Sequence, residues 1–152
     1  MWLHKNKVIE KIEDFPENTF GFIYKIKNIE TGKFYIGKKQ LMSTTNVKMG
    51  KKELAEQPIQ RGRKTTKKQV IKESNWREYW GSNKPLLEEL KTDKNKFTRE
   101  ILIICPSKKL LTYWELATQC KYDVLQSNSY NDNIQARYYR KDLATPSSID
   151  IL

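Results

Sequence analysis

The chain has 152 residues, with 29 lysines and arginines against 18 aspartates and glutamates, and a formal net charge of +11 at pH 7. A chain of this length most often forms one domain, and its strong positive charge indicates a polyanionic partner. It has a single histidine, His4, and two cysteines, Cys105 and Cys120, which form no CxxC pair. These counts argue against enzymes that need a central histidine or a histidine and cysteine metal cluster, such as serine, cysteine and zinc hydrolases.

The N-terminal residues 1–19 contain an amphipathic segment from Lys7 to Asp14. Its apolar residues fall on one side of a helix, and Pro16 would end that helix. We therefore expect an N-terminal helical extension that covers the edge of a sheet. No apolar stretch has the form of a signal peptide or a membrane span, so we expect a soluble, cytoplasmic protein without membrane contact.

Residues 20–39, FGFIYKIKNIETGKFYIGKK, have the pattern of a β-hairpin. Apolar side chains alternate along the first half at the period of a strand, turn-forming residues follow, and a second β-favouring run completes the pair. Pairing the two strands places Tyr24 close to Tyr35. On pattern alone, an ordinary core hairpin rich in β-favouring aromatic residues also explains this stretch.

Positive charge is concentrated in a long insertion after this hairpin, residues 38–73. Between Lys38 and Lys84 the chain has thirteen lysines and arginines and four glutamates, a local excess of nine positive charges. Residues 41–69 show little periodicity and are interrupted by glycine and proline, which predicts an extended loop. A charge run is often only a solvated surface, but this density favours contacts with nucleic-acid phosphates. The candidate DNA-binding residues are Lys38, Lys39, Arg61, Arg63, Lys64, Lys67, Lys68 and Arg77.

The second half of the chain predicts helices around one further strand. Ser74 is a candidate N-cap for a short helix that ends at Trp80, and Pro85 begins another helix over residues 86–91. Residues 96–104 predict a third strand, buried toward its end.

A longer helix is predicted from Lys108 to about Asp123, with Ser107 as its N-cap. Glu115 lies beside the apolar stripe of this helix, at the rim of a core, although a single helical glutamate normally faces solvent. The stripe itself comprises Leu110, Leu111, Trp114, Ala117 and Cys120. Residues 129–134 then predict a turn before a short final strand or helix, and residues 141–152 are expected to form a C-terminal tail.

Two parts of the hairpin, Phe22-Ile23-Tyr24 and Tyr35-Ile36-Gly37, resemble the two-part signature of the GIY-YIG nuclease family. Phe22 stands where the family often has glycine, and the second half fits without change. Residues 79–84, YWGSNK, resemble a YxGSxK segment of phage-type members. The resemblance implies a small α+β (α/β) domain over residues 20–140, with a three-stranded antiparallel sheet flanked by helices.

The resemblance also implies chemistry: a DNA endonuclease that hydrolyses phosphodiester bonds with one divalent metal ion, Mg²⁺ or Mn²⁺. Glu115 corresponds to the metal ligand, and Asn131 to the site asparagine, with Asn133 as a close second candidate. Tyr24 or Tyr35 would orient or deprotonate the attacking water, and a phenol needs nearby cations to act as a base at neutral pH. The available cations are Lys38, Lys39 and Lys84.

The family's catalytic arginine has no counterpart between Leu41 and Gly50, where Lys48 is the one cation. Its role could pass to Arg61, Arg63 or Arg77, or to a lysine such as Lys84, and Arg63 is the first candidate. The missing arginine also leaves a second hypothesis open, a catalytically inactive nucleic-acid-binding module of the same fold.

A basic structural or ribosome-associated protein is a third hypothesis, supported by charge alone. The expected partner is double-stranded DNA, with a homodimer as a further option, and the resemblance favours the cytoplasm of a bacterial or phage-infected cell.

Overall fold

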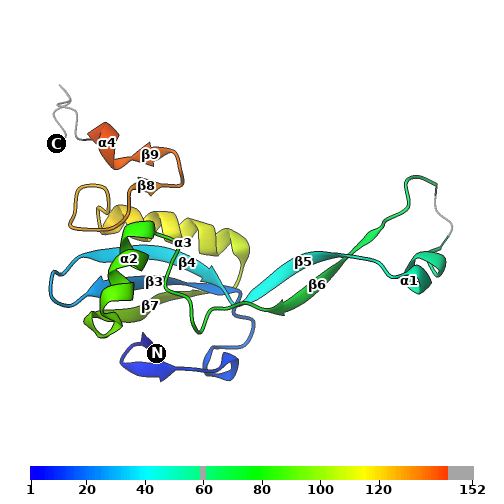
Figure 1. Cartoon of the computed structure of the whole chain (residues 1–152), viewed down its shortest axis with the longest axis horizontal. Helices are drawn as coiled ribbons and strands as arrows, with labels where there is room; N and C mark the ends of the chain where they lie inside the picture. Colours follow the sequence, from blue (N-terminus) through cyan, green and yellow to red (C-terminus); the bar gives the residue numbers. More distant parts are fainter. Residues whose placement is uncertain (59–60, 144–152) are drawn as a thin grey trace. The chain divides into compact units, whose positions relative to one another are not determined.

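The computed structural model describes residues 1–58 and 61–143, and the chain divides into two compact units. The sheet unit consists of residues 1–41 and the chain from residue 75 onward, and the ribbon unit consists of residues 42–74. Figure 1 shows the elements of both. The expected C-terminal tail lies outside the described residues from position 144 onward.

The sheet unit is built on five strands in the order β2-β1-β7-β3-β4. β3 (Gly21–Asn28) is the first strand of the predicted hairpin. It pairs antiparallel with β4 (Phe34–Gln40) on one side and with β7 (Phe97–Cys105) on the other. The predicted three-stranded antiparallel sheet is thereby confirmed. β4 is an edge strand, so its outer side is open to side chains from neighbouring helices and loops.

The predicted N-terminal helix is wrong. Residues 1–14 form a hairpin of β1 (Trp2–His4) and β2 (Lys7–Ile9), followed by the short 3-10 helix η1 (Ile12–Asp14). Lys5 and Asn6 turn the chain with positive φ angles of 47° and 65°. Trp2 is only 1% exposed and its Nε1 donates to the carbonyl of Trp76 at 2.8 Å, so this anchor draws β1 into the sheet, parallel to β7.

The sheet is covered on both faces, because alternate residues of a strand point to opposite sides. On one face, Phe22 and Tyr24 pack with Trp2, Trp76 and α2 (Lys84–Thr92). On the other, Ile23 and Ile36 pack with α3 (Lys108–Lys121), which lies along the sheet in Figure 1. The 3-10 helix η2 (Lys94–Lys96) leads from α2 into β7.

The helices after the insertion are partly as predicted. α2 begins after Asn83, whose side chain accepts from the Leu86 amide at 3.1 Å, and α3 begins after Ser107. Residues 74–80 form turns instead of the predicted helix. Buried Arg99 accounts for these turns. Its Nη1 donates to the carbonyls of Arg77 and Tyr79 at 2.9 and 2.8 Å, so these carbonyls bind Arg99 instead of the amides of a helix.

The predicted apolar stripe of α3 is correct at Leu111 but wrong at Leu110 and Trp114. Leu111, Thr118 and Gln119 are buried, whereas Leu110 and Trp114 are about 40% exposed. The helix therefore packs through a face that is partly polar, and its polar groups meet the backbone of the β4 edge. The chain then ends with β8 (Asn133–Ile134), β9 (Tyr138–Tyr139) and α4 (Arg140–Leu143).

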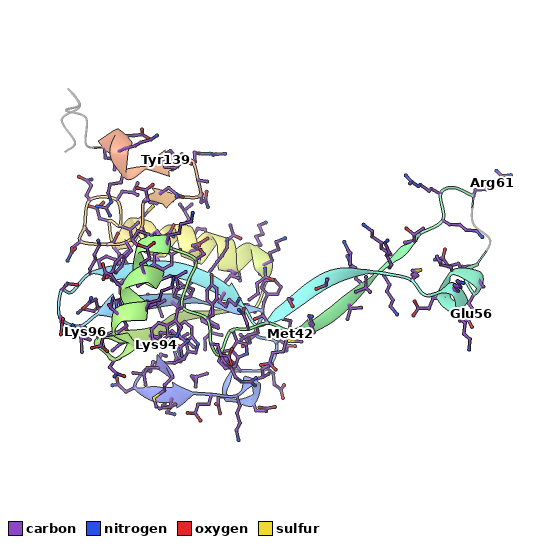
Figure 2. The ribbon with its side chains drawn as sticks, viewed as in Figure 1. Met42, Glu56, Arg61, Lys94, Lys96 and Tyr139 are labelled. Atoms are coloured by element: carbon purple, nitrogen blue, oxygen red, sulfur yellow. The ribbon has the colours of Figure 1, made fainter. Side chains whose placement is uncertain are left out.

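The ribbon unit replaces the expected extended loop. β5 (Met42–Lys48) and β6 (Lys67–Glu73) form an antiparallel pair, from Met42 opposite Glu73 to Lys48 opposite Lys67, and α1 (Lys51–Ala55) follows β5. Figure 2 shows the side chains along this pair, with Met42 at its start and Arg61 in the turn beyond its end. Most residues of both strands are exposed, so no apolar alternation marks them in the sequence.

None of the helices in the described part of the chain has the length and apolar composition needed to cross a bilayer.

Candidate active site

Tyr24 and Tyr35 lie beside each other on one face of the β3–β4 hairpin, with ring centroids 6.1 Å apart. Gly37 lies opposite Tyr24 in the pairing and provides the space that this side chain fills. A Cβ at Gly37 would lie 2.7 Å from Tyr24 Cζ and 3.0 Å from Tyr35 Cε1. The glycine that follows Tyr35 and Ile36 is therefore required by the close approach of both rings.

The segment 79–82 covers the two phenol rings. Gly81 has φ +84°, a left-handed conformation that favours glycine, and a Cβ there would lie 3.3 Å from Tyr35 Cε1 and 3.4 Å from Tyr24 Oη. The Tyr79 ring packs edge-on against Tyr24, with centroids 5.9 Å apart. Sequence reasoning noticed this segment through its YxGSxK resemblance but did not place it against the tyrosines.

Both tyrosines are held in the neutral form. Burial raises the pKa of Tyr24 well above its ordinary value, and Tyr35, Tyr79 and Glu115 raise it further. Burial also raises the pKa of Tyr35, although its hydrogen bonds with Ser82 and Tyr24 act in the opposite direction. A raised pKa does not favour either phenol as a base at neutral pH.

A pocket of about 290 Å³ opens at the edge of β4 and brings together side chains from both faces of the sheet. Tyr35 reaches it from one face, and Glu115 and Gln119 reach it from α3 on the other. Its lining consists of Tyr35, Ser82, Asn83, Glu115, Gln119, Asn131, Asp132, Asn133 and Gln135. All of these side chains carry oxygen atoms that can accept hydrogen bonds or bind a cation.

Glu115 forms an ion pair with Lys38, with 2.8 Å between Oε2 and Nζ. The Glu115 side chain is 17% exposed and that of Lys38 is 37% exposed, so the pair is partly shielded from water. Lys38 follows Gly37 in β4, and the alternation of the strand points it to the α3 side. Lys39 points to the opposite face, where its Nζ lies 4.0 Å from the centre of the Tyr79 ring and donates to Asn75.

Asn131 is 3% exposed and fixes the centre of the YIG sequence. Its Oδ1 accepts from the Ile36 amide at 3.0 Å, and its Nδ2 donates to the Ile36 carbonyl at 2.9 Å. Gln119 Nε2 donates to the same carbonyl at 3.2 Å. Both ends of the Asn131 side-chain amide therefore bond to the backbone of β4, which makes Asn131 a positioning residue.

Two residues that sequence reasoning did not select hold the Asn131 turn in place. Arg140 donates to the carbonyls of Val124, Ser127, Ser129 and Asn131 at 2.6 to 3.3 Å. The Tyr130 hydroxyl donates to Glu89, and burial raises the pKa of that phenol to about 12. No local sequence pattern signals either contact, because the partners are brought together only by the fold.

The other predicted cations lie elsewhere. Arg77 Nε donates to the Glu10 carbonyl at 2.9 Å, and Lys84 is an exposed residue at the start of α2, next to the pocket residue Asn83. Five more belong to the ribbon unit: Arg61, Arg63, Lys64, Lys67 and Lys68.

The residues at the pocket fit a hard divalent cation with few protein ligands. No group of three or more histidine, cysteine, aspartate or glutamate side chains that could hold a metal occurs within residues 1–58 and 61–143. Mg²⁺ is commonly bound by one or two carboxylates, with water and phosphate oxygens completing its octahedron. Two carboxylates, Glu115 and Asp132, lie among uncharged oxygen-bearing side chains in this lining and match that donor set.

Comparison with known families decides the relationship. Residues 2–143 match the family model described as "Putative endonuclease segE, GIY-YIG domain". The chain belongs to the GIY-YIG endonuclease family. The match includes the N-terminal hairpin and the ribbon unit, so both are parts of this GIY-YIG domain. No curated protein and no solved structure matches the chain.

Proposed function

We propose that this GIY-YIG domain is a metal-dependent DNA endonuclease that hydrolyses phosphodiester bonds at the β4 edge pocket. The observation that carries the proposal is the convergence of Tyr35 and Glu115, from opposite faces of the sheet, in one oxygen-lined pocket. A scissile phosphate in this pocket would have a hydroxyl group on one side and a carboxylate able to hold a cation on the other. Mg²⁺ or Mn²⁺ is the expected ion.

In the proposed reaction, water attacks phosphorus, the bond to the 3′ oxygen breaks, and the proton of the water ends on that oxygen. A divalent cation held by Glu115 would supply charge neutralisation for the phosphate and the leaving oxygen. Because both phenols are neutral near pH 7, Tyr35 would orient the water and the phosphate by hydrogen bonds. Tyr24, which is buried, would hold Tyr35 in position.

Lys38 is the best candidate for the charge that the family's arginine supplies. It forms an ion pair with Glu115, which is one of the pocket residues. The ammonium group neutralises the carboxylate in the absence of a cation. With a cation held by Glu115, the Lys38 ammonium group would be free to donate a hydrogen bond to a phosphate oxygen.

The ribbon unit would supply much of the affinity for DNA. Lys48 lies directly opposite Lys67 across the β5–β6 pair, and like charges in that arrangement repel each other. Repulsion of this kind is relieved when a phosphate lies between the two ammonium groups. A two-stranded antiparallel ribbon also has the dimensions that fit the major groove of a DNA duplex, which favours double-stranded DNA as the substrate.

Cleavage of supercoiled plasmid tests the proposal, with Mg²⁺ or with EDTA, for the wild type and two variants. Glu115→Gln should lower the rate about a hundredfold or more while DNA binding persists. Glu88→Gln, an exposed carboxylate on α2, is the matched control and should cleave like the wild type.

Cleavage that continues in EDTA, or in Glu115→Gln at the wild-type rate, would refute the metal assignment. Binding without any Mg²⁺-dependent product would instead support an inactive nucleic-acid-binding module, which the absence of arginine from the pocket lining favours as the second candidate.

A further inference from the structure

We infer that Gln119 Oε1 is a second protein oxygen of the divalent-cation site, directed at the cation or at a water molecule bound to it. The inference rests on the proposed function, because it assumes that Glu115 holds a cation. Gln119 was not among the residues selected from the sequence.

The amide of Gln119 has a fixed orientation. Its Nε2 donates to the Ile36 carbonyl at 3.2 Å, and a carbonyl can be paired only with the nitrogen end of the amide. The Asn131 amide is arranged in the same sense around Ile36. Gln119 Oε1 is therefore the end of the side chain that points away from the β4 backbone.

This oxygen lacks a partner. Gln119 is 5% exposed, and its Oε1 is one of two buried side-chain polar atoms of the described residues that have no hydrogen bond. Leaving a buried acceptor unpaired costs about 1–3 kcal/mol, so such atoms in folded proteins usually meet water or a ligand. The other unpaired atom, Arg99 Nε, lies far from this chemistry, between Trp2 and Trp80.

Gln119 lines the same pocket as Glu115. Gln119 and Glu115 are four residues apart on α3, so their side chains lie on the same face of the helix, one turn from each other. Both line the pocket that also contains Tyr35. An uncharged amide oxygen beside the Glu115 carboxylate adds a hard donor without adding charge, which suits a cation that keeps most of its waters.

Binding of Mn²⁺ to the intact protein, without DNA, tests the inference, with free Mn²⁺ measured by electron paramagnetic resonance. Gln119→Met should raise the dissociation constant about tenfold, the lower end of the range for groups that support a metal site. The Ile36 carbonyl keeps its bond from Asn131 in this variant, so the fold should persist. Gln126→Met, on an exposed glutamine, is the matched control and should bind like the wild type.

The outcomes separate the two proposals. If the wild type binds Mn²⁺, Glu115→Gln does not, and Gln119→Met binds as tightly as the wild type, the role of Gln119 is refuted and the metal site stands. If the wild type binds no Mn²⁺, both proposals fail.

A second measurement needs no variant. On addition of Mg²⁺, the Gln119 side-chain carbonyl ¹³C resonance should shift more than that of Asn131, whose oxygen is already bonded to Ile36. Equal or absent shifts in a protein that binds Mg²⁺ would overturn the inference.

Discussion

Replacement of Gly37 by alanine tests whether the YIG glycine exists to admit the Tyr24 ring. The added methyl group would lie 2.7 Å from Tyr24 Cζ and closer still to its hydroxyl oxygen. Tyr24 cannot move away freely, because it is 1% exposed and packs against the rings of Trp2, Phe22 and Tyr79. The substitution therefore forces a rearrangement of a closely packed core.

Overpacking of this kind costs about 1–3 kcal/mol. A cost of about 2 kcal/mol would lower the melting temperature of a chain of this size by roughly 4–8 °C. Cleavage of plasmid DNA should also fall, because Tyr35 would be displaced by the same methyl group, which lies 3.0 Å from its Cε1.

Urea unfolding and plasmid cleavage measure these effects, with Gly50→Ala as the matched control. Gly50 has an ordinary φ of −69°, and a Cβ there meets no atom within 4 Å, so this substitution should change little. Adding Tyr24→Phe to Gly37→Ala removes the closest contact and should recover part of the lost stability. Wild-type stability and cleavage in Gly37→Ala would refute the reasoning.

Three further predictions concern other parts of the chain. Asn131→Leu leaves the Ile36 amide without its acceptor and should lower the free energy of unfolding by about 2–3 kcal/mol in urea titrations; a loss below 0.5 kcal/mol would contradict its positioning role. Because the folded-state pKa of Tyr24 is raised, the unfolded state ionises first, so the contribution of Tyr24 to stability should be constant below about pH 10 and be lost above it. Above about pH 10 stability should therefore fall less steeply in Tyr24→Phe, and equal profiles in that range would contradict the assignment. Three ribbon cations, Arg61, Arg63 and Lys64, can be replaced together with glutamine. The slope of log K for DNA binding against log salt concentration should then fall by about one unit per lost phosphate contact, and an unchanged slope would exclude these residues from the interface.

The elements that the sequence predicts well are those with local signals. The hairpin has aromatic alternation and a turn, α2 has Asn83 and Pro85 at its start, and α3 has Ser107 as its N-cap. These signals act over a few residues, so their effect does not depend on the rest of the fold.

Two of the failures have one physical cause, which is dependence on distant residues. β1 forms because Trp2 bonds to Trp76, and residues 74–80 turn because Arg99 binds two of their carbonyls. The pairing of β5 with β6 is invisible as a periodicity, because neither face of that ribbon is buried.

The candidate site shows the same division. Tyr24 and Tyr35 come together through the hairpin, and Glu115 reaches the same pocket through the predicted helix. Two further contacts define the site, namely Lys38 with Glu115 and Asn131 with Ile36. Both contacts depend on which strand lies at the edge of the sheet. That position cannot be read from spacing alone.

The exposed ribbon has a consequence for the solubility of the protein. In the described part of the chain, β5 and β6 pair only with each other, so each strand presents an open edge that could add a strand from another molecule. Lysines at the paired positions 48 and 67, together with Lys68 and Lys72, give this edge a positive charge that repels a second copy. The residues proposed to hold DNA would then also act as gatekeepers against aggregation, so neutralising them should make the unbound protein self-associate.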